Sequence, residues 1–354
     1  MPEYFFDLSK QDQYDALEQG RAETGRPSHL LEKDLWVVWA LRTLFESPIS
    51  GDLTFKGGTS LSKVYKVIDR FSEDIDLTYD IRKLIPDLIG DGGELPVSRS
   101  QAAKWTQAVR HRLPGWVMGN VQPVIQEALI REGLDARLEL GGSGNDKLFL
   151  HYPALIKGTG YVAPIITLEF GGRATGEPHG VFQVSCDLAD YLPEVTFPTA
   201  SPLVMSIART FWEKATAIHV FCAQGRIRSE RYARHWHDLA AIARSPHFAS
   251  VFADLQVAMD VARHKSHFFI EKDATGQVID YAAAINGQLK FVPEGEAKAA
   301  LEKDYAAMLA DEVMIGDALP FDRLLEICAG LEVKLNHRIH TFNDNDMDSH
   351  VTFR

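Results

Sequence analysis

The chain has 354 residues, 45% of them hydrophobic and 24% charged, which is typical of a folded globular protein with room for two lobes. A net charge of −12 disfavours a protein that coats nucleic acid, because such proteins need an excess of Lys and Arg to neutralise phosphates. Three widely spaced cysteines exclude a disulfide framework and a cysteine-based zinc site. With no secretory signal and no long apolar run, we expect a cytoplasmic protein that has no membrane partner.

The first 200 residues combine helical and strand-like patterns. Ser28 is a candidate N-cap for a helix that ends near residue 45, where Pro48 and Gly51 follow. A helical pattern at 98–131 is weakened by Pro114-Gly115. A short helix is expected at 59–68, and strands at 53–55, 75–79, 136–140, 147–152, 165–170 and 181–186.

After Pro202 the pattern becomes helical. Helices are predicted at 206–223, 230–244, 248–263, 296–309 and 321–336. We therefore place a boundary near residue 200, between a mixed α/β lobe (1–200) and a helical C-terminal lobe (201–354). The expected fold class is α/β (α+β) with a mixed sheet.

A glycine pair connects the predicted strand at 53–55 to the next helix. Glycines let a backbone approach a ligand closely, and the N–H groups at a helix start suit phosphate. The nucleotide-binding candidates of this segment are Gly57, Gly58, Thr59, Ser60 and Lys63. The spacing is not that of a Walker A loop, and an ordinary tight turn would give the same pattern.

Paired carboxylates follow in the predicted strand at 75–79. Alternate residues of a strand share a face, so Asp74 and Asp76 should point the same way. Two neighbouring carboxylates repel each other unless a cation lies between them, and Mg²⁺ prefers such oxygen ligands. Glu169, in the strand at 165–170, could add a third metal ligand. Solvated acidic residues at strand ends are the alternative.

Lys214 falls on the apolar stripe of the helix at 206–223, where a core residue would normally lie. A lysine there is costly unless its ammonium group meets an anion or water, so we predict a nucleotide contact. Asp238, on the next helix, could orient Lys214 or pair with Arg234 one turn earlier. A basic stretch is the candidate nucleic-acid surface, and a solvated charged face is its alternative; it contains Arg226, Arg228, Arg231 and Arg234.

The order of these motifs resembles the AbiEii/AbiGii nucleotidyltransferase toxins of the DNA polymerase β-like superfamily. The most specific part is the run from Gly57 to Lys63 followed by the run from Arg70 to Leu77. Further similar segments lie at 32–36, 168–173 and 264–281, so the resemblance covers most of the chain. At His237 the family often has lysine.

The resemblance implies a polymerase β-like core and a toxin of a bacterial toxin–antitoxin or abortive-infection (phage defence) system. It further implies transfer of a nucleotide from a nucleoside triphosphate (NTP) with Mg²⁺, to an acceptor that is the 3′ end of tRNA in some members. An antitoxin encoded nearby is the implied partner. By matching positions, Gly57, Gly58 and Ser60 would hold phosphate, and Asp74 and Asp76 would hold the metal. Lys214 would contact the nucleotide, with Asp238 in support.

Two other functions fit the same residues. A metal-dependent nuclease would use the same carboxylates and would shorten RNA. A non-catalytic nucleotide-binding partner protein would bind a triphosphate without turnover.

Overall fold

The chain forms two compact units in a computed structural model. The structure describes residues 2–72, 74–89, 95–158, 163–226, 231–310, 314 and 318–348, with side chains as far as residue 337 of the last helix. Unit 1 consists of Met1–Lys66, Arg70–Pro96 and Ala103–Ser206; unit 2 consists of Val67–Asp69, Val97–Ala102 and Ile207–Arg354. Two short segments before residue 200 thus belong to unit 2, so the single boundary predicted near residue 200 does not fully describe the division.

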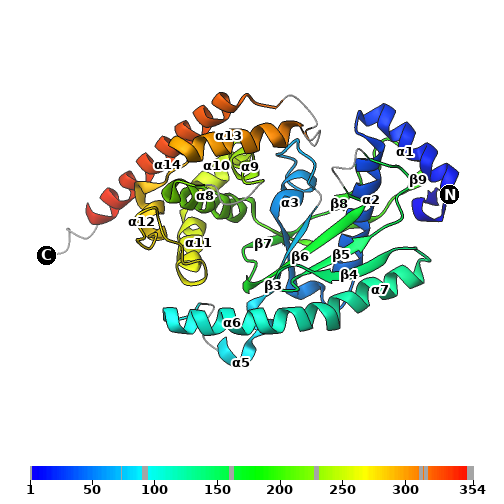
Figure 1. Cartoon of the computed structure of the whole chain (residues 1–354), viewed down its shortest axis with the longest axis horizontal. Coiled ribbons are helices and arrows are strands. Elements are labelled where there is room, and N and C mark those ends of the chain that lie inside the picture. Colours follow the sequence, from blue (N-terminus) through cyan, green and yellow to red (C-terminus); the bar gives the residue numbers. More distant parts are fainter. Residues whose placement is uncertain are drawn as a thin grey trace. The chain divides into compact units, whose positions relative to one another are not determined.

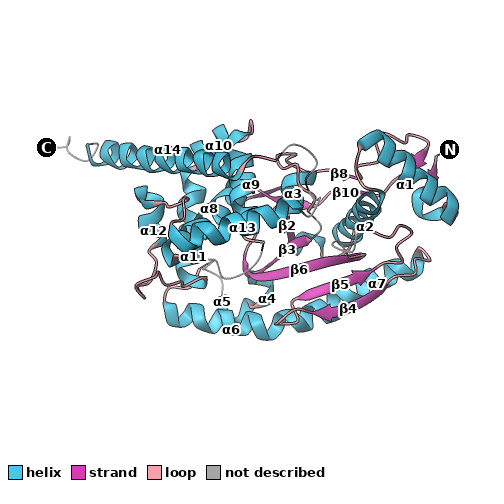
Figure 2. Cartoon of the chain, turned by 45° about the horizontal axis from the view of Figure 1, so that its top comes forward, coloured by secondary structure: helices cyan, strands magenta, loops and turns pink. Residues whose placement is uncertain are grey.

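Unit 1 is built on a seven-stranded mixed sheet, in the order β4-β5-β6-β3-β2-β11-β7 (Figures 1 and 2). These strands are β2 (Leu53–Lys56), β3 (Ile75–Asp80), β4 (Arg137–Gly141), β5 (Lys147–His151), β6 (Ile165–Ala174), β7 (His179–Val181) and β11 (Leu203–Met205). β3 pairs with β6 in parallel and with β2 antiparallel. β3 therefore lies at the centre of the sheet, between β2, which leads into the glycine pair, and β6, which carries Glu169.

Helices cover this sheet. The principal ones are α1 (Lys10–Thr24), α2 (Ser28–Phe45), α3 (Gly57–Lys63), α6 (Arg99–Trp116) and α7 (Gln122–Arg131), with short helices α4 (Ile81–Leu84) and α5 (Pro86–Ile89). α6 packs on the sheet face that carries Tyr79 and Phe170, because the Trp116 ring contacts both rings. Residues that alternate with these in β3 and β6 point to the opposite face.

Small strands tie down the ends of unit 1. β1 (Glu3–Tyr4) pairs in parallel with β9 (Val195–Thr196), and β8 (Val184–Ser185) pairs antiparallel with β10 (Thr199–Ala200). The β8–β10 pairing anchors the segment around Asp187, which follows β8.

Unit 2 is helical. It contains α8 (Ile207–Gln224), α9 (Ala233–Arg244), α10 (Phe248–Ala253), α11 (Leu255–Phe268), α12 (Tyr281–Ala283), α13 (Gly295–Ala310) and α14 (Phe321–Asp348). Its core includes Trp212 and Trp236, both fully buried. The indole N–H of Trp236 donates to the carbonyl of Phe291 at 2.7 Å, which ties α9 to the segment before α13.

Several predicted bounds were wrong. Ser28 is the first residue of α2 rather than its N-cap, and its hydroxyl donates to Glu18 at 2.6 Å. α3 begins and ends earlier than expected. The helical pattern at 98–131 continues past Pro114 through a π-helical turn at Val117–Val121. The expected strand at 181–186 is the two short strands β7 and β8.

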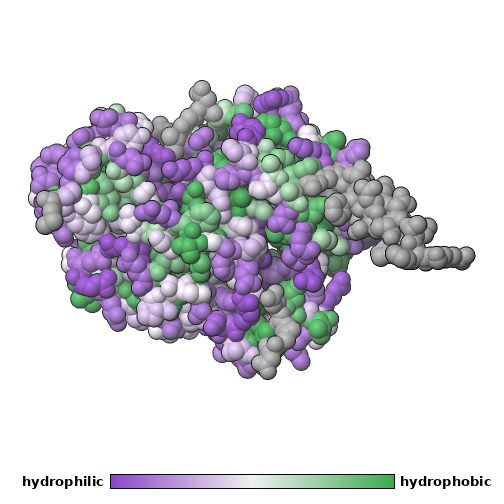
Figure 3. Space-filling model, turned by 180° about the vertical axis from the view of Figure 1, so that it is seen from behind, coloured by the Kyte–Doolittle hydropathy of each residue, from purple (hydrophilic) through white to green (hydrophobic). Residues whose placement is uncertain are grey.

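No helix of the described residues is long and apolar enough to cross a membrane. On the face drawn in Figure 3, hydrophilic side chains surround the hydrophobic ones.

Candidate functional site

The glycine loop and the carboxylate strand meet at Gly57. Gly57 has a φ of +80°, which side-chain-bearing residues rarely adopt, and it is the first residue of α3. A Cβ at this position would overlap the carboxylate of Asp76. Lys56 and Asp76 are also partners in the β2–β3 pairing. The structure therefore brings together two motifs that are nineteen positions apart in the sequence.

The hydroxyl groups of Thr59 and Ser60 are used inside this loop. Both side chains are fully buried. Thr59 Oγ1 donates to the carbonyl of Asp74 at 2.5 Å, and Ser60 Oγ donates to the carbonyl of Gly57 at 2.9 Å. Thr59 thus fixes the loop to the carboxylate strand instead of facing a ligand. For Ser60 to bind a phosphate, the phosphate would have to replace the Gly57 carbonyl as its acceptor.

Asp74 lies immediately before β3, and Asp76 is the second residue of β3. Both are half-buried, whereas the intervening Ile75 and the following Leu77 are fully buried. In the parallel pairing of β3 and β6, Asp76 is the register partner of Glu169. Three carboxylates therefore come from neighbouring backbone positions.

The side chain of Glu169 is nevertheless held by a lysine. Lys147 on β5 is its register partner on the other side, and Lys147 Nζ donates to Glu169 Oε2 at 2.5 Å. Burial works to lower the pKa of Lys147, but the hydrogen bond to Glu169 and the charges of Glu169, Asp74 and Asp146 outweigh it, so its pKa is raised. Lys147 stays charged and competes with a metal for the Glu169 carboxylate.

The predicted three-carboxylate metal site is therefore not assembled. Among the residues that the structure describes, no three His, Cys, Asp or Glu side chains are grouped so that they could hold a metal ion. The pair Asp74 and Asp76 still fits Mg²⁺, because enzymes of nucleotides commonly hold it with one or two carboxylates, water and the substrate phosphates. Glu169 does not fit as a third ligand in this arrangement.

Lys63, predicted to bind the nucleotide, lies instead in a buried ion pair. Its Nζ is 2.6 Å from Asp34 Oδ1 and 2.7 Å from Asp187 Oδ1, and its side chain is 8% exposed. An ammonium group already satisfied by two carboxylates is poorly placed to bind a third anion. A phosphate could bind Lys63 only by displacing one of these carboxylates, so phosphate binding by Lys63 stays a prediction that the ion pair argues against.

In unit 2, the structure brings Lys214 and Asp238 together. Lys214 Nζ is 3.0 Å from Asp238 Oδ2, in a pair whose side chains are 12% and 0% exposed. The other carboxylate oxygen, Oδ1, lies 3.1 Å from His237 Nδ1. Asp238 thus holds two side chains, and Lys214 reaches its buried position because an anion meets it there. This contact was one of the alternatives open in the sequence.

The basic stretch is only partly described, because Arg228 lies outside the described residues. Arg226 and Arg231 are exposed, and Arg234 is half-buried. Arg231 has a φ of +70°, and its main-chain N–H donates to Asp304 Oδ1 at 2.7 Å. The basic stretch therefore stays a predicted surface for a nucleic-acid backbone.

Three further residues for which the sequence predicted no role lie at these sites. They are Arg70, Lys147 and His237. Arg70 is 3% exposed, and a Cβ on Gly58 would meet its guanidinium group, so a positive charge lies beside the glycine loop. For Lys147, the available signal was a lysine at the start of the strand-like run Lys147-Leu148-Phe149.

The chain is similar to a known protein family and to solved structures. The family model described as the nucleotidyl transferase AbiEii toxin of type IV toxin–antitoxin systems matches residues 39–327. Two solved structures are similar. The first is MenT4, a nucleotidyltransferase toxin from Mycobacterium tuberculosis H37Rv: 17% identity, TM-score 0.38, covering 92% of this chain and 99% of that one. The second is a putative nucleotidyltransferase from H. pylori: 13% identity, TM-score 0.41, covering 87% and 94%. A search of curated proteins gave no match.

The family match includes both the glycine loop with its carboxylates and the Lys214–Asp238 pair. A nucleotidyltransferase takes its nucleotide from an NTP, and a toxin of this type works with an antitoxin. The chain therefore belongs to the AbiEii family of nucleotidyltransferase toxins of type IV toxin–antitoxin systems.

Proposed function

We propose that the protein transfers a nucleotide from an NTP to the 3′-hydroxyl of an RNA, with tRNA as the acceptor, and that Mg²⁺ is held by Asp74 and Asp76. The observation that carries this proposal is the contact between Gly57 and the Asp76 carboxylate. It places a backbone that phosphate can approach closely beside a carboxylate that can hold a metal. We also propose the cytoplasm as the location, since NTPs and tRNA are found there.

The residues divide the work as follows. Main-chain N–H groups at Gly57 and Gly58 would contact the triphosphate, while Thr59 keeps the loop against the strand of Asp74 and Asp76. Lys214, oriented by Asp238, would contribute a positive charge to the nucleotide. When bound, the metal neutralises phosphate charge and favours the deprotonated acceptor hydroxyl.

The proposed reaction exchanges one phosphorus–oxygen bond for another, as in other nucleotidyl transfers. The acceptor hydroxyl releases its proton to water, and its oxygen forms a bond to the α-phosphorus. The bond from that phosphorus to the bridging oxygen of the β-phosphate breaks, and pyrophosphate leaves. In-line geometry requires the acceptor oxygen and the leaving oxygen to lie on opposite sides of the phosphorus.

The test is label transfer. Purified protein is incubated with Mg²⁺, total tRNA and each of the four α-labelled NTPs, and the RNA is resolved on a sequencing gel. We expect lengthened, labelled tRNA with wild type and none with Asp76→Asn. The matched control is Asp135→Asn, an exposed aspartate in the loop after α7, which should act as wild type.

Other outcomes identify the rival functions. Shortened RNA would indicate a nuclease. Binding of an NTP with no change in the RNA would indicate a binding protein. Labelled RNA of another kind, with tRNA unmodified, would contradict the acceptor while keeping the reaction.

A further inference from the structure

Three consecutive charged residues are buried in α2, one helical turn after its start. Glu32, Lys33 and Asp34 are 2%, 2% and 3% exposed. The carboxylate of Glu32 accepts two main-chain N–H groups, from residues 155 and 156, at 2.8 and 3.2 Å. Lys33 Nζ donates to the carbonyl of Ala163 at 2.9 Å. Each buried charge therefore holds a segment that is distant in the sequence.

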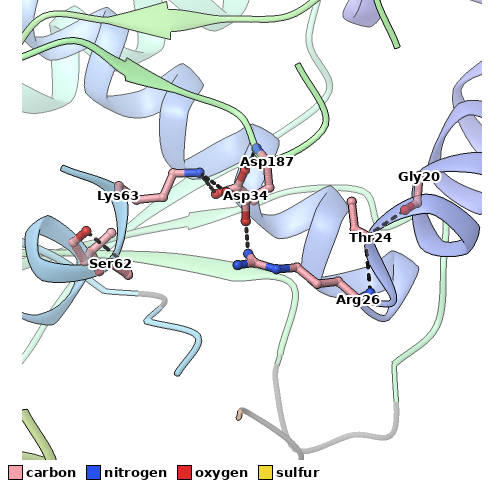
Figure 4. A network of polar contacts seen from close by, with 8 residues as sticks. Gly20, Thr24, Arg26, Asp34, Ser62, Lys63 and Asp187 are labelled. Atoms are coloured by element: carbon pink, nitrogen blue, oxygen red, sulfur yellow. Dashed lines mark hydrogen bonds and ion pairs between the residues drawn. The ribbon is translucent and has the colours of Figure 1, made fainter. Parts of the chain in front are cut away.

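Asp34 holds the third segment and, through it, the glycine-loop helix. Asp34 Oδ2 accepts the main-chain N–H of Asp187 at 2.7 Å, while Asp34 Oδ1 pairs with Lys63 Nζ at 2.6 Å. The carboxylate of Asp187 then bridges two cations, because Oδ1 pairs with Lys63 and Oδ2 with Arg26 (Figure 4). We call these four residues the Lys63 network.

The Lys63 network is electrically balanced and mostly buried. It contains two carboxylates and two cationic groups, and the Lys63 and Asp34 side chains are 8% and 4% exposed. In such a place each ion depends on its partner, because an unpaired buried charge is far more costly than a broken surface pair. Its four members come from α2, the end of α3, the segment after β8 and the loop before α2.

We propose that the Lys63 network is a positioning device for the glycine loop. α3 is seven residues long, so it is too short to be stable on its own. Thr59 fastens its beginning to Asp74, and Lys63, its last residue, fastens its end to α2. With both ends fixed, Gly57 is held against Asp76. Lys63 is then a positioning residue, and the inference rests on the proposed function of this loop.

The first measurement does not depend on that function. Amide hydrogen exchange over residues 57–63 is compared for wild type, Lys63→Met and Lys63→Arg. Losing one hydrogen bond to a charged group costs a factor of roughly ten or more in local stability, so exchange in this segment should rise by about that factor in Lys63→Met. Lys63→Arg restores the charge and should recover part of the protection.

The matched control is Arg42→Met. Arg42 also anchors α2, through a partly buried ion pair with Glu132 at 2.7 Å. Among the described residues, no hydrogen bond or ion pair joins Arg42 to the Lys63 network. Arg42→Met should lower overall stability without a selective rise at residues 57–63. If Lys63→Met does not fold, the pair variant Asp34→Asn/Lys63→Met, which removes one charge of each sign, replaces it.

The second measurement is steady-state transfer. A misplaced loop should raise the KM for NTP about tenfold, in line with the local loss, while kcat changes less and Arg42→Met leaves KM at the wild-type value. Exchange at 57–63 equal to wild type, or rising no more than in Arg42→Met, would overturn the positioning role. If exchange at residues 57–63 rises selectively in Lys63→Met while the wild type transfers no nucleotide, the proposed function is disproved and the positioning role is kept.

Discussion

Gly57 combines two requirements that other residues cannot satisfy together. Its φ of +80° disfavours any residue with a Cβ, and the Asp76 carboxylate occupies the space that a Cβ would need. Gly133 shares a positive φ, +62°, yet a Cβ there would have nothing within 4 Å. Substitution at Gly133 therefore tests the effect of backbone strain alone, whereas substitution at Gly57 adds a clash with the Asp76 carboxylate.

We predict that Gly57→Ala abolishes label transfer, whereas Gly133→Ala keeps it. Both variants should lose about 1–2 kcal/mol of stability through the left-handed backbone. Only Gly57→Ala also displaces Asp76. Transfer rates and urea unfolding of both variants check this. Equal activity in the two variants would contradict a functional contact between Gly57 and Asp76.

For the carboxylates, we predict unequal roles. Mn²⁺ binding, measured by electron paramagnetic resonance in the presence of a non-hydrolysable NTP analogue, should be lost in Asp76→Asn. Glu169→Gln should leave the affinity within about twofold, because its carboxylate is paired with Lys147. Loss of binding in Glu169→Gln equal to that in Asp76→Asn would restore Glu169 as a metal ligand.

For the Lys214–Asp238 pair, we predict that a second substitution can restore part of the folding stability without restoring the KM for NTP. Lys214→Met leaves the fully buried Asp238 without its ammonium partner and should cost roughly 3–5 kcal/mol, the range for broken buried pairs. The double variant Lys214→Met/Asp238→Asn should recover part of that loss while its KM for NTP stays raised. Recovery of KM together with stability would show that Lys214 has only a structural role.

At the scale of elements, local periodicity predicted most helices and strands but not what ends them. α2 matched the predicted range because its apolar residues recur at helical spacing. The helix expected at 248–263 is divided at Asp254, whose side chain accepts the N–H of Val257 as an N-cap, a signal that the sequence does carry. α3 ends at Lys63, and Lys66 with a φ of +51° follows.

The candidate site was predictable only where its contacts are local or follow from strand alternation. The alternation of half-buried Asp74 and Asp76 with buried Ile75 and Leu77 follows from the period of a strand. The pairing of Lys63 with Asp187 and of Lys147 with Glu169 depends on which distant strands and loops become neighbours. Periodicity contains no such information, so the predictions for Lys63 and Glu169 did not include the partners that compete with a ligand for each side chain.

One pH-dependent contact ties α8 to the segment before α13. Burial, aided by the charge of Lys290, lowers the pKa of His219 from 6.5 to about 4, and its Nδ1 accepts the main-chain N–H of Lys290 at 3.2 Å. Above pH 6.5 both the folded and the unfolded forms hold neutral imidazole. Between pH 6.5 and 4 only the unfolded form takes a proton, so stability should fall by roughly 3 kcal/mol and then level off.

His219→Asn should flatten that decline, because asparagine keeps an acceptor and has no titration in this range. Urea unfolding at pH 7.5, 6, 5 and 4 measures it, with His111→Asn, a change at an exposed histidine of α6, as the control. A pH profile of His219→Asn identical to that of wild type would contradict this account.

At the scale of the whole molecule, an acidic enzyme must bind an acidic substrate. The net charge of −12 makes long-range attraction to polyanions unfavourable, so under the proposed function the binding of NTP and RNA would have to come from local positive charges and the proposed metal. Such an enzyme should be sensitive to the loss of single cations near its site. The family match places this chain among nucleotidyltransferase toxins.

In the proposed function, Asp76, held against Gly57, supports metal-dependent transfer of a nucleotide to the 3′ end of tRNA. The most direct measurement is the label-transfer assay with wild type, Asp76→Asn and Asp135→Asn at equal concentrations. We expect labelled tRNA one or more nucleotides longer with wild type and Asp135→Asn, and none with Asp76→Asn. Equal labelling by wild type and Asp76→Asn, or no labelling by wild type with any NTP, would contradict it.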